Sequence, residues 1–231
     1  MGLRLHADEE HWIPLADLMT GLMFLFLLIA LAFMVQVELQ AAKVKKIAVV
    51  YDRTRQDLYR DLDREFHKDL PKWGAELSEQ TLSIRFKEPD VLFETGSDRL
   101  SPRFTAILAD FFPRYIRILT NKQYRNSVSE VRIEGYTSSI WQPGASVREA
   151  YIGNMALSQS RTRSVLQYVL GLASLQAQQP WLMNRVTANG LSFSHLIVLN
   201  GKESQSRSQR VEFRVRTDAD QEIHKILELS K

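Results

Sequence analysis

The sequence of 231 residues contains no cysteine. This absence excludes a disulfide framework, a Cys-ligated zinc or iron–sulfur site, a catalytic thiol and a lipid-modified cysteine. Glycine and proline are sparse, at 10 and 7 residues, which excludes a collagen-like or low-complexity chain. Neither sign of charge dominates, and the formal charge of +3 does not by itself indicate nucleic acid. The hydrophobic content of 45% predicts one large folded domain, or one domain plus attachments.

Motifs that mark common catalytic sites are also missing. The chain holds no GxSxG, P-loop, GxGxxG or HExxH sequence, and nothing selects one serine as a nucleophile. The 5 histidines are scattered without metal-ligand spacing. In residues 81–231, 20 basic residues stand against 14 acidic ones, but they are not interleaved with aromatic residues as in nucleic-acid-binding segments. We therefore expect no enzyme, no metal, no cofactor and no nucleic-acid partner.

What the sequence does contain is one long apolar run. Between Asp17 and Glu38, residues 18–37 carry no charge, and at about 1.5 Å per residue they form about 30 Å of helix, the thickness of a bilayer core. Apolar residues occupy every face, whereas a soluble helix of this length shows a polar stripe. A signal peptide would need a basic start and a small-residue cleavage site, and the acidic start HADEEHW disfavours it. We predict a membrane-spanning helix over 13–37, preceded by a short tail, 1–12.

Asp17 is the one charged residue within the predicted membrane helix. Because Pro14 suits the first helical turn, Asp17 lies about one turn inside the helix. Its position leaves two interpretations open: a carboxylate at the membrane surface favoured by the positive helix N-terminus, or an intramembrane carboxylate that binds and releases a cation beside a partner helix. Thr20 and the small Gly21 add a polar, closely packing face, which favours the second interpretation.

The segment 38–80 has the pattern of a solvated helix with one apolar seam. Apolar residues recur at helical spacing from Val44 to Phe66, and 9 basic residues balance 9 acidic residues in the whole segment. The heptad pattern is too short for a stable coiled coil, so a docked amphipathic linker helix is favoured. The sequence Pro71-Lys72-Trp73-Gly74 predicts the end of this helix and a domain boundary.

Residues 81–231 alternate strand and helix patterns. Strands are predicted where polar and apolar residues alternate, and helices where apolar residues recur with a period of about 3.6. In chain order these are a strand at 81–86, a helix from Ser101 with a kink at Pro113, a strand at 128–135, a helix capped by Asn154, strands at 185–190 and 210–217, and a closing helix at 219–229. This βαβαββ order predicts an α/β sandwich with helices on one face of the sheet.

A loop followed by a helix is the best candidate for a binding site. After the strand at 128–135 come Tyr136-Thr137-Ser138-Ser139, a polar loop to Asn154, and a helix that carries Arg161. Free N–H groups at a helix N-terminus and a two-pronged guanidinium suit a carboxylate ligand. The alternative is an ordinary helix cap with a surface arginine, and the residues alone favour that alternative.

Four segments in this order and spacing resemble the OmpA-like peptidoglycan-binding domain: EPDVLFETGSDRLSPRF, VRIEGYTSS, NMALSQSR and RSQRVEFRV. The resemblance covers residues 81–217. With WIPLADLMTGLMFLFLLI in front, the whole chain is similar to the MotB family of stator subunits. Its short tail with few basic residues, its compact linker and the long loop after TSSIW are most like the ZorB subunits of Zorya antiphage defence systems.

The resemblance implies partners and site residues. It implies an ion-driven motor subunit that forms a homodimer inside a ring of five MotA-type or ZorA-like membrane subunits, transports H+ or Na+ and binds no cofactor. In their A-D-x-M-T context, Asp17 matches the ion-carrying carboxylate and Thr20 lies beside it. The positions matched to peptidoglycan binding are Thr137, Ser138, Asn154, Leu157 and Arg161, with Arg161 as the residue that grips a stem-peptide carboxylate. The family usually has His-Thr-Asp where this chain has Tyr-Thr-Ser, and the serine supplies no charge for an ammonium group.

The resemblance also implies an orientation in the bacterial inner membrane. Peptidoglycan lies outside this membrane, so residues 1–12 are expected in the cytoplasm and 38–231 in the periplasm. The positive-inside rule favours the opposite orientation, because Lys43, Lys45 and Lys46 follow the predicted helix. Two alternative functions stay open: a flagellar MotB-type stator subunit, and a passive tether between membrane and cell wall.

Overall fold

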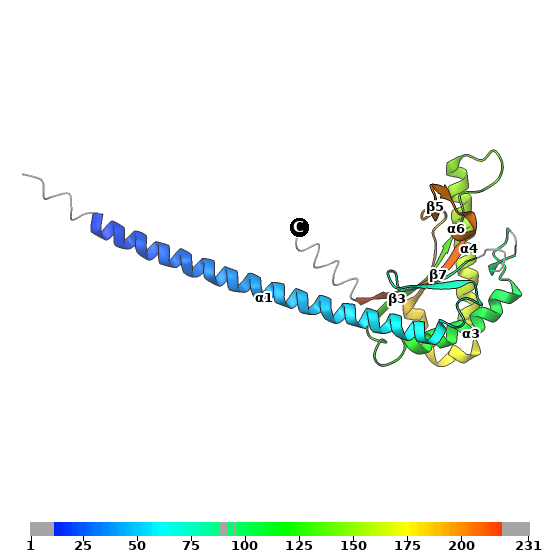
Figure 1. Ribbon diagram of the computed structural model, residues 1–231, viewed down its shortest axis with the longest axis horizontal. Coiled ribbons are helices and arrows are strands. Elements are labelled where there is room, and N and C mark those ends of the chain that lie inside the picture. The colour runs from blue at the N-terminus through cyan, green and yellow to red at the C-terminus, as the bar shows by residue number, and fades with distance from the viewer. Residues whose placement is uncertain (1–11, 88–91, 95, 219–231) are drawn as a thin grey trace, which may run out of the picture. The chain divides into compact units, whose positions relative to one another are not determined.

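The computed structural model describes residues 12–87, 92–94 and 96–218. These residues fall into two units that meet between Val50 and Tyr51. The helix α1, Trp12–Phe66, contributes its first part to one unit and its last part to the other (Figure 1). Within the described residues, every strand belongs to the second unit. The expected membrane helix and the expected binding domain therefore lie in different units.

The first unit consists of the N-terminal part of α1. Its segment Pro14–Ala42 is long and apolar enough to cross a membrane by length and composition, with a mean hydropathy of 2.7. The large apolar side chains that the structure describes between Leu15 and Leu39 are each more than half exposed. An apolar surface of this length is not stable in water, so it requires a cover of lipid or of partner helices.

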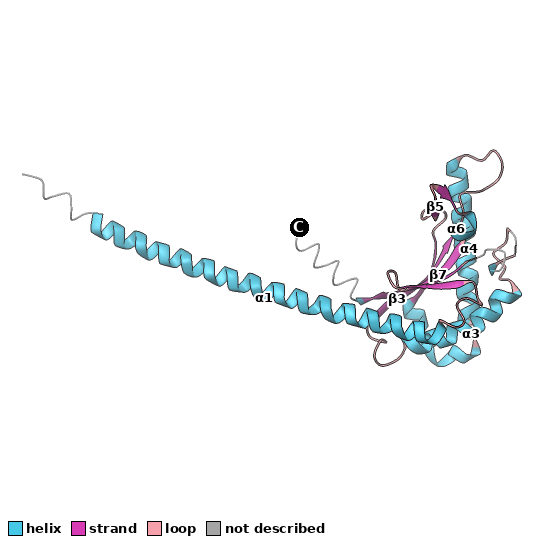
Figure 2. Ribbon diagram, viewed as in Figure 1, coloured by secondary structure: helices cyan, strands magenta, loops and turns pink. Residues whose placement is uncertain are grey.

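The second unit is built around a sheet of five strands in the order β1-β2-β7-β3-β4. Its strands β3 and β7 are labelled in Figure 2. The strands are β1 Ala75–Ser78, β2 Ser83–Phe86, β3 Val128–Tyr136, β4 Val186–Gly190 and β7 Arg210–Thr217. Among the described strands of this sheet, only the β3–β4 pair is parallel; β1–β2, β2–β7 and β7–β3 are antiparallel. The remaining elements are α3 Pro102–Leu119, α4 Val147–Leu170, η1 Ala173–Gln178, α5 Gln179–Arg185, β5 Val198–Leu199, β6 Lys202–Glu203 and α6 Gln205–Ser208.

One face of the sheet forms the hydrophobic core with the helices, because strand side chains alternate between faces. On β7 the residues Val211, Phe213 and Val215 are buried in the core. The other side of the same strand carries Arg210, Glu212, Arg214 and Arg216. This alternation leaves one apolar face and one charged face on a single sheet.

The end of α1 is part of this core and not a separate linker. Leu58, Leu62 and Phe66 have no solvent-exposed surface and pack in the same hydrophobic cluster as the sheet. The ring of Phe66 lies 5.3 Å from the ring of Phe111 on α3, centroid to centroid. From Leu58 onward, the apolar seam predicted within 38–80 packs into the core of the second unit.

The structure confirms the α/β class and corrects several expected boundaries. The expected strands at 81–86, 128–135, 185–190 and 210–217 correspond to β2, β3, β4 and β7. The predicted strands did not include β1, which lies inside the segment assigned to a linker helix. They also did not include the short β5–β6 hairpin. The closing helix expected at 219–229 lies outside the described residues.

The expected helix cap at Asn154 is wrong. Helix α4 begins at Val147, where the Ser146 side chain accepts a hydrogen bond from the Glu149 amide and the Glu149 carboxylate accepts one from the Ser146 amide. This capping box satisfies two N-terminal donors and therefore starts the helix earlier than the apolar pattern suggests. Asn154 and Arg161 consequently lie within the helix, so neither is beside a free helix N-terminus.

Candidate functional site

The residues expected to bind peptidoglycan come together where β3 ends beside α4. Thr137 and Ser138 follow the last residue of β3, whereas Asn154, Leu157 and Arg161 recur at helical spacing on α4 and so share one side of that helix. Thr137, Ser138 and Asn154 are almost completely buried, and Arg161 is 9% exposed. The structure thus joins two sequence segments, but it places most of their polar groups inside the domain.

Arg161 makes its contacts within the protein. Its Nε donates a hydrogen bond to the Ser97 carbonyl oxygen over 3.0 Å, and its guanidinium carbon lies 4.8 Å from the centre of the Phe93 ring. The cavity beside Arg161 and Tyr136 has a volume of about 10 Å³, which is room for about one water molecule. A ligand carboxylate at this guanidinium must therefore share it with, or displace, Phe93 and Ser97.

Asn154 connects α4 to the loop after β3. Its Nδ2 donates to the Ile140 carbonyl oxygen over 3.1 Å. The Ser158 hydroxyl, one turn later, accepts a hydrogen bond from the Ser192 amide over 3.1 Å. Leu157 is partly buried on the same helix. The side chain of Asn154 therefore has a positioning role, because it fixes the path of the loop that carries Thr137 and Ser138.

Thr137 and Ser138 differ in how their hydroxyl groups are satisfied. The Ser138 hydroxyl accepts a hydrogen bond from Gln209 Nε2 over 3.1 Å. The Thr137 amide donates to the Ser192 carbonyl over 2.9 Å, but among the described residues the buried Thr137 hydroxyl has no hydrogen-bond partner. A buried hydroxyl without a partner costs free energy, so Thr137 is the group of this site best placed to accept or donate a bond to a ligand or water.

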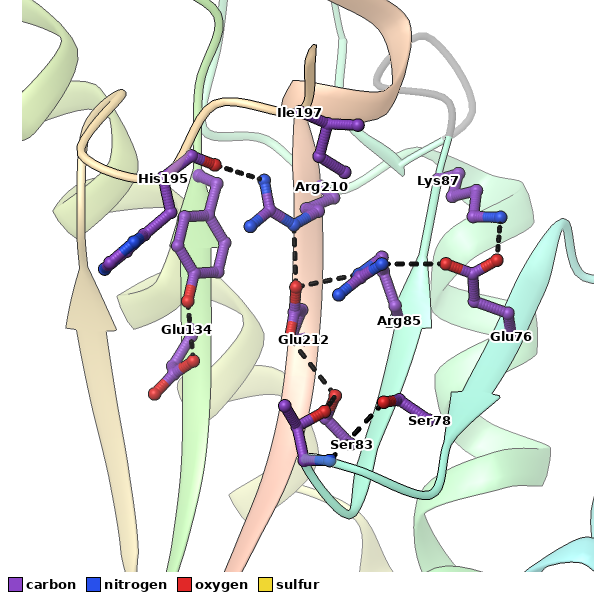
Figure 3. Close-up of polar contacts among 12 residues, drawn as sticks. Glu76, Ser78, Ser83, Arg85, Lys87, Glu134, His195, Ile197, Arg210 and Glu212 are labelled. Carbon is purple, nitrogen blue, oxygen red and sulfur yellow. Dashed lines mark hydrogen bonds and ion pairs between the residues drawn. The ribbon is translucent and has the colours of Figure 1, made fainter. Parts of the chain in front are cut away.

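Sequence reasoning missed two charged groups at this end of the sheet. The guanidinium carbon of Arg210 lies 3.7 Å from the centre of the Tyr136 ring, and its NH1 donates to the His195 carbonyl over 3.2 Å (Figure 3). The Glu203 carboxylate accepts hydrogen bonds from the amide and the hydroxyl of Ser139. The segment RSQRVEFRV includes Arg210, but its pattern describes a strand and does not show what lies above it.

Arg210 is held by the charged face of the sheet. Its Nε donates to Glu212 over 2.7 Å, and Arg85 Nε donates to the same carboxylate oxygen over 2.8 Å (Figure 3). Burial alone would raise the pKa of the Glu212 carboxyl, but the hydrogen bonds and charges of Arg210 and Arg85 outweigh burial and hold this pKa below its ordinary value. Glu212 is therefore ionised at neutral pH and orients both arginines.

Asp17 and Thr20 lie in the first unit, on the apolar part of α1. Asp17 is exposed on the helix surface. The Thr20 hydroxyl donates to the Ala16 carbonyl oxygen over 2.7 Å, so it is satisfied within its own helix. Within the described residues, no three His, Asp or Glu side chains are grouped in a way that could hold a metal ion. Asp17 therefore presents an exposed carboxylate near the start of the apolar segment.

Comparison with known proteins places these features in a family. The chain is 47% identical over 222 residues to a Zorya protein ZorB of Escherichia coli (strain Crooks), covering 96% of this chain and 94% of that protein. It is 26% identical over 217 residues to the ZorB of a second Escherichia coli strain (ETEC), covering 90% of this chain and 81% of that protein. No family model matches the chain.

A solved structure shares the fold of the second unit. The crystal structure of a MotB-like protein of Desulfovibrio vulgaris matches 73% of this chain and 94% of its own, with a TM-score of 0.54 and 24% identity. The expected OmpA/MotB-like α/β fold is therefore confirmed. Identity of 47% over nearly the full length of both proteins is a stronger criterion than shared fold, because folds are shared by proteins of different function. The chain belongs to the ZorB family.

Proposed function

We propose that this protein is an ion-driven motor subunit of the stator type in the bacterial inner membrane, and that it acts in Zorya antiphage defence. The observation that carries the proposal is an exposed carboxylate, Asp17, at the start of an apolar helix in a member of the ZorB family. A carboxylate among lipid tails is costly, so such residues mark ion paths and partner contacts. Asp17 takes up H+ or Na+, and neutralisation changes its attraction to the surrounding subunits.

The exposed apolar surface of α1 supports the proposal that this helix contacts partner subunits in the membrane. Large side chains are exposed along the whole span, and Gly21, whose Cβ position is open, permits close approach of a second helix. We propose a homodimer surrounded by five ZorA-like, MotA-type subunits. In this proposal residues 1–12 lie in the cytoplasm and the second unit lies in the periplasm. This orientation is opposite to the one that the positive-inside rule favours. Activity of a cytoplasm-only reporter fused to Lys231 would contradict this topology.

The second unit anchors the motor to peptidoglycan. Support comes from the convergence of Thr137, Ser138 and Arg161 at one end of β3 and from the family relationship. The unpartnered Thr137 hydroxyl offers a hydrogen bond to a stem peptide, and Arg161 offers a charge-assisted bond to its carboxylate. Because Arg161 also contacts Ser97 and Phe93, binding of wall material involves a rearrangement of those contacts.

Replacement of Asp17 tests the motor function. Asp17→Asn keeps the size of the side chain but removes its ionisable group, so it is expected to abolish ion flow and phage protection while the protein still co-purifies with its ring subunits. Glu38→Gln removes a carboxylate at the other end of the apolar run and serves as the matched control, with near wild-type protection. If Asp17→Asn protects fully, the protein is not an ion-driven motor.

Replacement of Arg161 tests the anchor. Arg161→Gln removes the cation and is expected to lower co-sedimentation of the full chain with purified sacculi by about tenfold or more, the loss expected for one or two charge-assisted hydrogen bonds. Arg163→Gln changes an exposed arginine of the same helix and should bind normally. Loss of function with Arg161→Gln combined with tolerance of Asp17→Asn would indicate a passive tether.

A further inference from the structure

A hollow on the charged face of the sheet is lined by four arginines and is separate from the site beside Arg161. It has a volume of about 470 Å³ and is bordered by Arg132, Arg214 and Arg216 of the sheet, Arg55 of α1, and the β1–β2 turn at Gln80 and Thr81. We name it the arginine hollow. Its volume falls within the range of about 300–1,000 Å³ typical of small-molecule sites. Among the described residues, no carboxylate lines it.

The register of the sheet places like charges side by side. Arg214 of β7 lies directly opposite Arg132 of β3, and Arg216 follows two residues later on the same face. Directly opposed like charges destabilise a sheet unless something neutralises them. The side chains of these three arginines are 30–33% exposed, so solutes can reach them.

The nearby carboxylates do not fully neutralise these arginines. Glu212 is held at 2.7 and 2.8 Å by Arg210 and Arg85, whereas its closest ion-pair distance to Arg214 is 3.6 Å. Figure 3 shows Glu212 bonded to Arg210 on one side and to Arg85 on the other. Arg214 Nε lies 3.4 Å from Glu134 and, among the described residues, has no hydrogen-bond partner.

Glu130 is shared between two cations. It accepts a hydrogen bond from Arg132 Nε over 2.7 Å, but Arg216 NH1 remains 3.9 Å away. Arg55 donates hydrogen bonds to the carbonyl oxygens of Glu79 and Gln80, which do not carry a full charge. The hollow therefore collects four guanidinium groups with an excess of positive charge.

We propose that the arginine hollow binds a phosphate group, either as free phosphate or as the head group of an anionic phospholipid. Guanidinium groups bind phosphate oxygens through paired N–H donors. A tetrahedral anion can accept bonds from several arginines at once, whereas a single carboxylate satisfies fewer. An anion between Arg132 and Arg214 removes their mutual repulsion.

Calorimetric titration of the full chain in a nonionic detergent tests the proposal. The two ligands are sodium phosphate and dihexanoylphosphatidylglycerol, each at an ionic strength fixed with chloride. Saturable binding of at least one ligand is expected, and Arg55→Gln combined with Arg216→Gln should weaken it by about tenfold or more. These two arginines are chosen because neither is the only close partner of a buried carboxylate. Binding of phosphate alone identifies the free anion as the ligand, and binding of the lipid identifies a head group.

A matched control removes two positive charges elsewhere. Arg99→Gln with Arg117→Gln changes two well-exposed arginines outside the hollow and should leave the affinity unchanged. The absence of saturable binding to the wild type, or an equal loss in this control, overturns the proposal. If near-ultraviolet circular dichroism shows that the first double variant is unfolded, Arg55→Lys with Arg216→Lys replaces it. The two lysines keep the positive charge but lack the paired N–H donors of a guanidinium, so this variant should bind the ligand at least about threefold more weakly. An unchanged affinity overturns the proposal.

Discussion

Glu212 shows how one residue organises the charged face of the sheet. Its side chain is almost completely buried, and it accepts hydrogen bonds from Arg210, Arg85 and the Ser83 hydroxyl. A buried carboxylate is tolerated only when it is paired and hydrogen-bonded. Because Arg210 also stacks on Tyr136, the ionisation of Glu212 is coupled to the end of β3 that carries Thr137 and Ser138.

The lowered pKa of Glu212 predicts a stability that depends on acid. A carboxyl whose pKa is lower in the folded state than its ordinary 4.5 stabilises the fold above that value, and this contribution is lost as the pH falls through the folded pKa. The thermal unfolding midpoint of the wild type in detergent should therefore decrease as the pH is lowered below about 4.5. Glu212→Gln should be less stable at pH 7 and change less with acid. The exposed Glu94→Gln is the control, and equal pH slopes for wild type and Glu212→Gln would contradict the assignment.

At the scale of elements, the close packing of β4 on α4 depends on one glycine. Gly190 ends β4, and a Cβ there would overlap the backbone nitrogen and Cα of Gln159 on α4. Backbone atoms of a helix cannot move aside as the tip of a side chain can. The pairing of β3 with β4 and the position of α4 beside the candidate site both rely on this approach.

Gly190→Ala should accordingly destabilise the domain. Forced overpacking costs about 1–3 kcal/mol, measured as the change in unfolding free energy by denaturant titration. Gly171→Ala is the matched control, because Gly171 lies at the end of α4 in a right-handed helical conformation and an added Cβ meets only ordinary contacts. It should change the stability by less than about 0.5 kcal/mol. Equal effects of the two variants would show that the close approach is not important.

At the scale of the whole molecule, the two units differ in how they bury apolar side chains. The first unit exposes apolar side chains along the candidate span. The second unit contains its own core, to which Leu58, Leu62 and Phe66 of α1 contribute. Helix α1 therefore begins in the first unit and ends in the core of the second.

Two fragments test where the folded domain begins. The fragment 51–231 retains the buried residues of α1 and is expected to unfold cooperatively, with a near-ultraviolet circular dichroism spectrum. The fragment 67–231 keeps β1 but loses Leu58, Leu62 and Phe66. Truncation of one buried apolar side chain costs about 2–5 kcal/mol, and three such losses approach the total stability of a typical domain, about 5–15 kcal/mol. Similar unfolding midpoints for the two fragments would show that this part of α1 is dispensable.

Local sequence patterns were enough to predict the candidate membrane helix, the main strands and the family. The uninterrupted apolar run determined the candidate membrane helix with Asp17 at its start, since hydrophobicity and length act along the chain. Strand alternation determined β2, β3, β4 and β7 to within two residues at either end. Motif order was enough to indicate the family, which the 47% identity confirms. Each of these features depends on residues that are close in the sequence.

Only the tertiary structure decided which groups meet. The burial of Arg161 against Phe93, the use of Asn154 to hold the loop at Ile140, and the stacking of Arg210 on Tyr136 join residues that are 14 to 74 positions apart. Strand order places Arg132 opposite Arg214, and no local pattern shows that two basic residues 82 positions apart share a row. Burial and charge pairing depend on distances in space, so the composition of each site follows from the fold, whereas the class of fold follows from the sequence.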